Sequence, residues 1–357
     1  MKELQIHKGD LTQTRLVDAP DPVIGDGEVL MEIEQFGFSS NNITYAVTGH
    51  TLRYWQFFPP QDEPSGDWGL LPVWGFATVA ESQCEDLPVG SRLFGYWPTA
   101  SHMKMTPVKV TDARAIDGAA HRADLPRAYN GYRRVGAAQP MMDSPMMLLS
   151  PLYITSWCLW DYLVDNDWFG AERVIIASAS SKTSIGLATA LAVDPDAKPS
   201  LGLTSGGNLV FTEGLGLYDA VQSYHDLTEI DASIPSVIVD MSGNAAVLGK
   251  LFQHLDNNLS YCINVGLTHW DEPTKGTGIP KERKEMFFAP GHIQKRSTEW
   301  GAAELDKKTT AFMMQAGMKA QAWINYDEST GLDALESVYP DVAAGKIEPN
   351  KGLVIKM

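Results

Sequence analysis

Hydrophobic and polar residues follow two different periods along this chain. In the first third, short segments with partly alternating apolar residues, separated by turn residues, predict β-strands. Strands spaced this closely are typical of a small antiparallel barrel or sandwich. The predicted strands cover residues 4–19, 28–38, 73–80, 90–97 and 102–110, and a short helix is predicted at 43–47.

From residue 148 onward, short apolar runs alternate with helical segments. Strands that alternate with helices indicate a parallel, doubly wound sheet. The tail returns to alternating helix and strand, so we expect an α/β protein with a second, β-rich part. The predicted strands are 174–176, 200–204, 218–222, 236–241, 260–266, 320–325 and 352–356, and the predicted helices are 148–164, 185–192, 245–254, 303–316 and 331–339.

The second half is organised around residues 173–192, RVIIASASSKTSIGLATALA. A strand, a turn of small residues and a helix in this order can hold a phosphate group. The first N–H groups of a helix lack acceptors, and the helix dipole places positive charge at that end. The candidate cofactor-binding residues are Ser180, Ser181, Lys182, Thr183, Ser184, Ile185 and Gly186.

This phosphate-binding turn departs from the usual dinucleotide fingerprint, in which three glycines allow a tight turn and close packing. Ser181 and Thr183 stand at the first two of these positions, and only Gly186 remains. Lys182 at a helix start opposes the helix dipole unless an anion offsets it. The other interpretation of these hydroxyls is a polar, solvated N-cap cluster.

Composition narrows the classes of function. The chain has 357 residues, is 44% hydrophobic and carries a formal net charge of −16, which argues against nucleic acid or an anionic membrane as the main partner. Its three cysteines, Cys84, Cys158 and Cys262, are too far apart in sequence to suggest a disulfide framework or a zinc site. No apolar run reaches the roughly 18 residues that a membrane span needs, so we expect a cytoplasmic protein.

The order of the motifs resembles the medium-chain dehydrogenase/reductase superfamily, in particular its zinc-free, quinone-oxidoreductase-like branch. The segments that carry the resemblance are GEVLMEIEQFGFSSNN, VWGFATVAES, LPVGSRLFGYW, SPLYITSWCLW, GLGLYDAVQSYHD and SVIVDMSGNAAV. The resemblance implies a discontinuous GroES-like domain at 1–144 and 300–357, with a Rossmann nucleotide-binding domain at 145–299. The missing glycines and the long segment 268–300 place the chain in a divergent branch.

The resemblance also bears on the catalytic residues. Ser39 stands where alcohol dehydrogenases of the superfamily have a zinc-ligating cysteine, and no set of three metal ligands is visible, so we expect chemistry without a metal. Ser39 and Asn42 fall where zinc-free members have polar side chains near the nicotinamide. Tyr45 and Tyr54 are candidate proton donors. Helix capping for Ser39 and simple packing for both tyrosines stay open as alternatives.

The cofactor preference follows from the second predicted strand of the nucleotide domain. No Asp or Glu ends this strand, so a 2′-phosphate would meet no repulsion there, which favours NADPH over NADH. No Arg or Lys lies in 201–209 either, a gap that Lys182 could fill. The further candidate cofactor-binding residues are Thr204, Ser205, Asn208, Tyr224 (through the resemblance), Gly243 and Gly266.

These observations predict NADPH-dependent reduction of an activated C=C bond or a quinone, with a small-molecule substrate. The alternative from another class is a dinucleotide-binding regulator or scaffold that has lost catalysis. We interpret Lys295-Arg296 as a solvated basic turn, the alternative being a site for an anionic substrate tail. Family analogy implies a homo-oligomer, commonly a dimer.

Overall fold

The computed structural model describes residues 1–265 and 277–357. The chain divides into two compact units, the first formed by Met1–Leu148 and Ile324–Met357 and the second by Leu149–Trp323. Two residues weighed from the sequence lie outside the described residues: Gly266, a candidate cofactor-binding residue, and His269, a lone histidine after a predicted strand that is more often packed or exposed than catalytic.

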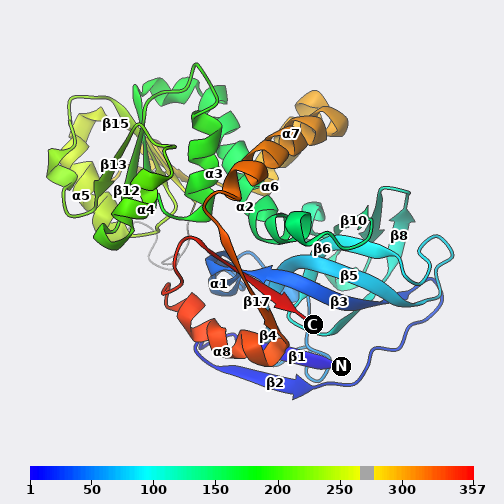
Figure 1. Ribbon diagram of the computed structural model, residues 1–357. Helices are drawn as coiled ribbons and strands as arrows, with labels where there is room; N and C mark the ends of the chain where they lie inside the picture. Colours follow the sequence, from blue (N-terminus) through cyan, green and yellow to red (C-terminus); the bar gives the residue numbers. More distant parts are fainter. Residues whose placement is uncertain (266–276) are drawn as a thin grey trace. The chain divides into compact units, whose positions relative to one another are not determined.

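The first unit is built mainly of antiparallel strands (Figure 1). Nine strands form one sheet in the order β17-β18-β3-β5-β6-β10-β9-β8, with β7 paired to β3, and a smaller sheet has the order β2-β1-β4. Its core contains the buried faces of both sheets together with α1 and α8. The elements are β1 (Lys2–His7), β2 (Thr14–Asp18), β3 (Val29–Phe38), α1 (Ser40–Val47), β4 (Trp68–Leu70), β5 (Pro72–Ser82), β6 (Arg92–Pro98), β7 (His102–Met105), β8 (Pro107–Val110), β9 (Arg114–Asp117), β10 (Gly131–Val135), β17 (Asn325–Thr330), α8 (Leu332–Ala343) and β18 (Lys351–Lys356).

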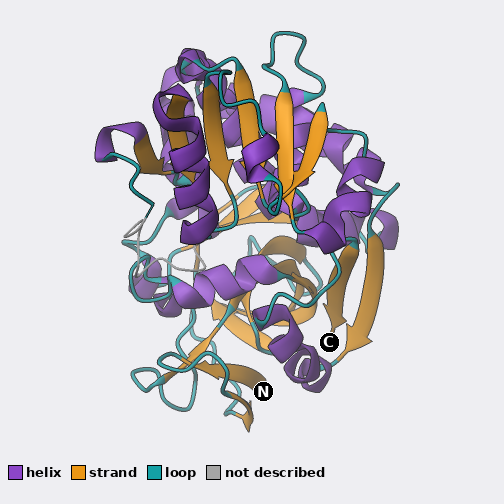
Figure 2. Ribbon diagram, turned by 90° about the vertical axis from the view of Figure 1, so that its left-hand side faces the viewer, coloured by secondary structure: helices purple, strands orange, loops and turns teal. Residues whose placement is uncertain are grey.

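The second unit is a parallel six-stranded sheet in the order β13-β12-β11-β14-β15-β16, with helices on both faces (Figure 2). Val174 and Ile176 of β11 pack with α2 and α3 on one face, whereas Ile175 packs with α5 on the other. The elements are α2 (Pro140–Asp165, which begins in the first unit), β11 (Arg173–Ala177), α3 (Lys182–Leu191), β12 (Ser200–Thr204), α4 (Leu209–Gly214), β13 (Ala220–Ser223), β14 (Ser236–Asp240), α5 (Ala245–Leu255), β15 (Leu259–Asn264), β16 (Lys284–Met286), α6 (Ala289–Trp300) and α7 (Ala302–Ala320).

Three segments differ from the expectations. Residues 300–323, which the sequence analysis assigned to the first domain, belong to the second unit, because α7 packs against α3 and α6. The strand expected at 320–325 is wrong: Ala320 ends α7, and the polar residues Asn325–Thr330 form β17 as an exposed edge strand. Gly37, expected as a turn or bulge residue at the end of the predicted strand 28–38, is a regular residue of β3 paired with Trp74, and a Cβ there would lie 2.9 Å from the Leu148 side chain.

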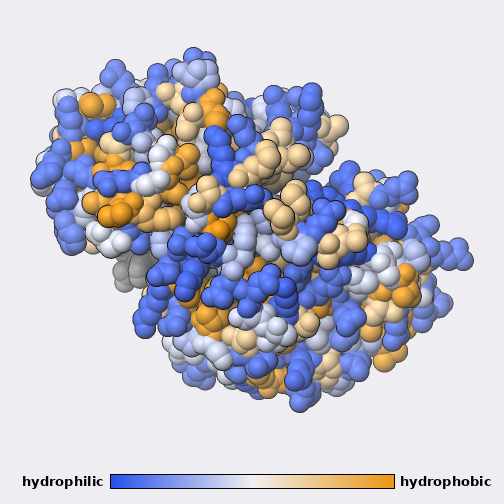
Figure 3. Space-filling model, viewed as in Figure 1, coloured by the Kyte–Doolittle hydropathy of each residue, from blue (hydrophilic) through white to orange (hydrophobic). Residues whose placement is uncertain are grey.

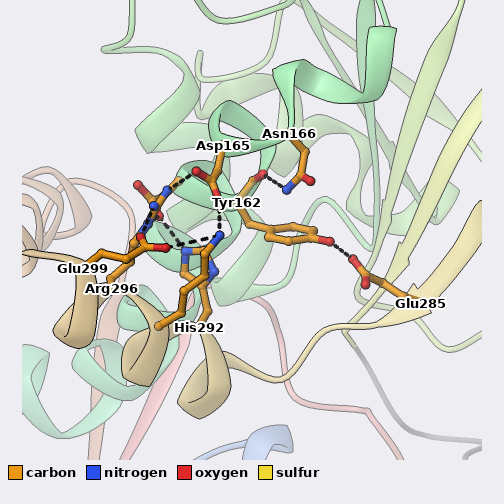
Figure 4. A network of polar contacts seen from close by, with 9 residues as sticks. Tyr162, Asp165, Asn166, Glu285, His292, Arg296 and Glu299 are labelled. Carbon is orange, nitrogen blue, oxygen red and sulfur yellow. Dashed lines mark hydrogen bonds and ion pairs between the residues drawn. The ribbon is translucent and has the colours of Figure 1, made fainter.

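A network of charged side chains joins α6 to α2 (Figure 4). The carboxylate of Asp161 accepts hydrogen bonds from His292 Nε2 and Arg296 Nε, both at 2.6 Å. Arg296 also pairs with Asp165 at 2.9 Å and with Glu299 at 2.6 Å. The interpretation of Lys295-Arg296 as a solvated turn is therefore wrong: both residues lie in α6, and Arg296 is buried and paired.

No helix among the described residues is long and apolar enough to cross a membrane. Hydrophilic residues predominate on the face drawn in Figure 3, and apolar residues are interspersed among them.

Candidate functional site

The turn between β11 and α3 is sharp and begins directly after the strand. Ser178 has a φ of +60°, in the left-handed region, where a residue other than glycine costs about 1–2 kcal/mol. Its backbone N–H donates to the hydroxyl of Tyr224 at 2.6 Å, which anchors the strained residue to the segment after β13. The sequence analysis assigned the first fingerprint position to Ser181. The structure places the left-handed residue three positions earlier, because β11 ends at Ala177.

Two of the serines cap α3 and hold it to the strand. Ser181 is the N-cap, and its Oγ accepts from the Ser184 backbone N–H at 3.2 Å. Ser184 is fully buried, and its Oγ donates to the carbonyl of Ala177 at 3.4 Å. Ser184 thus bonds the first turn of α3 to the end of β11.

Ile185 and Gly186 lie one turn inside α3 and have packing roles. The Ile185 N–H is bonded to the carbonyl of Ser181, and its side chain is fully buried. A Cβ on Gly186 would lie 2.5 Å from Ser156 Oγ and 2.7 Å from Tyr153 Cδ1, so this glycine allows α3 to approach α2. The expected helix–strand role of Gly186 is therefore taken by Ser184.

The remaining groups of the turn are hydrogen-bond donors. Ser180 Oγ accepts from Thr204 Oγ1 at 3.2 Å and from Asn208 Nδ2 at 3.1 Å, so its own proton is left to donate. Among the described residues, the backbone N–H groups of Ser180 and Thr183 make no hydrogen bond. A set composed of donors suits an anion such as a diphosphate.

Two ionisable residues flank the turn. Burial lowers the pKa of Lys182 to about 8, which makes its charge sensitive to pH in the neutral to alkaline range. Burial, together with the nearby Asp240 carboxylate, raises the pKa of Tyr224 to about 12. Because the Tyr224 hydroxyl accepts from Ser178, its proton is also left to donate.

The segment after β14 is shaped by Asp240. Its carboxylate accepts from the backbone N–H groups of Ser242 at 2.8 Å and Gly243 at 3.1 Å, and burial raises its pKa. Gly243 has a φ of +63° in this turn. Ser205 is exposed at the end of β12 and makes no side-chain cap.

In the first unit, Ser39 and Asn42 form a capping box at the start of α1. Asn42 Oδ1 accepts from the Ser39 backbone N–H at 2.8 Å, and Asn42 Nδ2 donates to the carbonyl of Pro72 at 2.9 Å. Both side chains therefore have structural partners, and Asn42 is buried.

The two candidate tyrosines pack together, with their ring centroids 4.6 Å apart. The hydroxyl of Tyr54 lies 3.1 Å from that of Tyr129, and the hydroxyl of Tyr45 accepts from Trp74 Nε1 at 3.3 Å. Burial raises the pKa of both Tyr45 and Tyr54.

Sequence reasoning missed four residues that shape these two regions: Ser178, Asp240, Trp74 and Tyr129. Ser178 directly follows Ala177, the last residue of β11, and Asp240 ends the run SVIVD, so only their positions at strand ends distinguish them. Trp74 lies within the segment VWGFATVAES, where nothing in the sequence indicates a contact with Tyr45, and Tyr129 lies in a segment for which no strand or helix was predicted. Among the described residues, no group of three His, Cys, Asp or Glu side chains gathers as metal ligands.

Comparisons with known proteins agree on the fold. Three of the most similar solved structures are CurA from Vibrio vulnificus in complex with NADPH, a mutant enoyl thioester reductase from Candida tropicalis, and the Haloferax mediterranei glucose dehydrogenase in complex with NADP, Zn and gluconolactone. Their TM-scores are 0.65, 0.58 and 0.56, at 12%, 11% and 12% identity, and each match covers 100% of this chain and 99% of the other. The predicted fold, a GroES-like β domain plus a Rossmann domain, is confirmed.

No curated protein sequence matches this chain. One family model does, over residues 36–348, which is most of the length. The chain therefore belongs to the family described as Protein of unknown function (DUF2855).

Proposed function

We propose that this protein is an NADPH-dependent, metal-independent oxidoreductase that reduces an activated C=C bond or a quinone. The observation that carries the proposal is the donor set at the β11–α3 turn, which presents N–H and O–H groups where dinucleotide-binding sheets hold a diphosphate. Support also comes from CurA, a structure of the same fold described as a complex with NADPH.

The cofactor would be held by residues of the second unit. Ser180, Thr183 and Lys182 would contact the diphosphate, and Thr204, Ser205 and Asn208 lie at the end of β12, where the ribose end of a dinucleotide binds in this type of sheet. The turn after β14 at Gly243 borders the same sheet edge. A bound NADPH supplies the hydride.

We also propose roles for four residues of the first unit. Tyr45 and Tyr54, which pack together, are the candidate proton donors, while Ser39 and Asn42 hold the start of α1 in place. The substrate would be an enone, an enoyl thioester or a quinone, whose carbonyl carries the developing negative charge.

The proposal is tested in two steps. NADPH and NADH are compared for their effect on the thermal unfolding midpoint, and a larger shift with NADPH is expected. NADPH oxidation is then followed at 340 nm with a panel of enones, quinones and enoyl thioesters. Absence of any NADPH shift would contradict cofactor binding.

A second function is favoured by the serines at the turn. Ser181 and Ser184 direct their hydroxyls at neighbouring protein atoms in place of the usual glycines. A regulator or scaffold that binds the dinucleotide without turnover is consistent with this replacement. NADPH binding without oxidation across the whole panel would favour it.

The assembly and compartment are proposed by analogy. We propose a homo-oligomer, which light scattering of the purified protein would measure, in the cytoplasm.

A further inference from the structure

A buried carboxylate lies beside the β11–α3 turn. Asp240 ends β14, and its backbone is the register partner of Ala177, the last residue of β11, so the two residues stand on neighbouring strands about 4.8 Å apart. Ser178, the left-handed residue of the turn, follows Ala177 directly. Because the Asp240 side chain is fully buried, its charge lies in a poorly solvated environment next to this turn.

The segment after β14 supplies three hydrogen bonds to this carboxylate. Asp240 Oδ1 accepts from the backbone N–H of Ser242 at 2.8 Å and from Ser242 Oγ at 2.5 Å. Asp240 Oδ2 accepts from the backbone N–H of Gly243 at 3.1 Å. These bonds favour the ionised form of Asp240. They also engage two N–H groups at the carboxyl edge of the sheet with an anion of the protein itself.

The charge of Asp240 has no cationic partner among the described residues. Burial raises its pKa, and the bonds from its own turn lower it. The titratable groups that face it from the neighbouring strands are Tyr224, after β13, and Cys262 of β15. Burial, together with the charge of Asp240, raises the pKa of both groups. On α3, the pKa of Lys182 is lowered by burial. Asp240 is therefore a buried negative charge that hydrogen bonds alone support.

We propose that Asp240 regulates the cofactor site: its carboxylate opposes the diphosphate of the dinucleotide, and cofactor binding is therefore coupled to the uptake of one proton from solvent by Asp240. This inference rests on the proposed function, in which the β11–α3 turn holds the diphosphate. A second negative charge beside a buried carboxylate favours the protonated acid. Because linkage is reciprocal, protonation of Asp240 favours the bound cofactor, so affinity rises as pH falls.

The test measures the protons that are taken up on binding. Calorimetric titrations are run in two buffers with different ionisation enthalpies, from about pH 7.5 down to about pH 5. NADP+ is the ligand, because the reduced cofactor decomposes in acid. Its 2′-phosphate titrates near pH 6 as well. That contribution comes from the ligand and is common to all variants, so each variant is compared with the wild type at the same pH.

Asp240→Asn keeps the size of the side chain and removes its charge. At pH 7 it should bind NADP+ about tenfold more tightly than the wild type, the equivalent of one pKa unit. It should also take up fewer protons, and the two affinities should converge towards pH 5. Asp219→Asn is the matched control, because Asp219 Oδ2 accepts from the Ser200 N–H at 2.7 Å and from Ser200 Oγ at 3.0 Å at the start of β12, the opposite end of the strands. This control should match the wild type.

Ser242→Ala keeps the inference testable even where Asp240→Asn does not fold. It leaves Asp240 in place and removes the bond from Ser242 Oγ, which raises the pKa of Asp240 further. The pH at which the affinity begins to rise should therefore move upward. A turn that is merely disturbed would weaken binding at every pH and leave that midpoint where it is.

The two failures remain distinguishable. If NADP+ binds, but proton uptake and pH dependence are the same in the wild type, Asp240→Asn and Ser242→Ala, the role of Asp240 is wrong and the proposed function stands. If NADP+ binds to none of these proteins at any pH, the proposed cofactor site is contradicted and the role of Asp240 falls with it.

Discussion

At the scale of single residues, hydroxyl groups at the β11–α3 turn divide into those that donate within the turn and those that accept a hydrogen bond there and keep their own proton. Ser181 and Ser184 bond to each other and to the backbone. Ser180 and Tyr224 accept from protein donors and keep their own protons. Sequence composition alone does not separate these roles, because all of these side chains are hydroxyls and only their partners differ.

Because of Lys182, we predict that the affinity of the β11–α3 turn for NADPH depends on pH. The Lys182 amine is charged below a pKa of about 8 and loses charge above it. A bound diphosphate favours the charged form, so NADPH affinity should fall as pH rises from 8, by about tenfold or more in Kd for one charge-assisted bond. Fluorescence titration with NADPH between pH 7 and 10 measures this.

The matched variants for this titration are Lys182→Ala and Lys250→Ala, since Lys250 is exposed on α5. Lys182→Ala should bind NADPH more weakly at pH 7 and show no fall above pH 8. Lys250→Ala should follow the wild type. Equal affinities of all three proteins at pH 7 would remove Lys182 from the phosphate site.

Gly186 predicts a loss of stability on substitution. An added methyl group would meet Ser156 and Tyr153 at distances below 3 Å, so Gly186→Ala should lower the free energy of unfolding by about 1–3 kcal/mol. Gly214→Ala is the control, since nothing lies within 4 Å of a Cβ there. Urea unfolding followed by fluorescence compares them, and equal midpoints would contradict the close approach of α3 to α2.

At the scale of elements, patterns of apolar residues located most of the parallel sheet. The strand predicted at 200–204 is β12, and the helix predicted at 245–254 is α5 with one more residue. Buried strands are recognisable because both faces are apolar. Edge strand β17 was missed because most of its residues are exposed, so burial imposes no pattern on them.

The candidate site was less predictable than the fold. The sequence located the β11–α3 turn but not its left-handed residue, Ser178, because a serine carries no signal for positive φ. The sequence indicated Tyr45 and Tyr54 as candidates but did not indicate their partners. Trp74 lies on β5, and Tyr129 lies in the segment before β10. Such contacts depend on strand register, which local sequence does not specify.

Packing of α6 on α2 depends on one buried carboxylate. Asp161→Ala removes the acceptor shared by His292 and Arg296, although Arg296 keeps Asp165 and Glu299. We expect the free energy of unfolding to fall by about 3 kcal/mol, the lower end for breaking a buried pair. Lys307→Ala is the control, because it removes an exposed ion pair with Glu304. It should change the free energy of unfolding by less than about 1 kcal/mol. Chemical denaturation measures both, and similar losses would refute the importance of Asp161.

At the scale of the whole molecule, each of the two units contains hydrophobic clusters of its own. A ligand held by the β11–α3 turn should therefore stabilise the second unit first. At a concentration of a hundred times its Kd, NADPH should raise the free energy of unfolding of that unit by about 2.7 kcal/mol. Hydrogen exchange followed by mass spectrometry should show slower exchange in residues 173–191, and protection confined to the first unit would contradict the proposed site.

The discontinuous first unit has a consequence for biosynthesis. Its largest sheet is completed by β18, which pairs with β3 on one side and β17 on the other, so strands from opposite ends of the chain are neighbours. While the ribosome is still adding residues 149–323, the backbone groups of β3 that β18 will later bond are unpaired. An open strand edge of this kind attracts other chains. Nascent copies of this protein should therefore depend on chaperone protection until the last strand emerges.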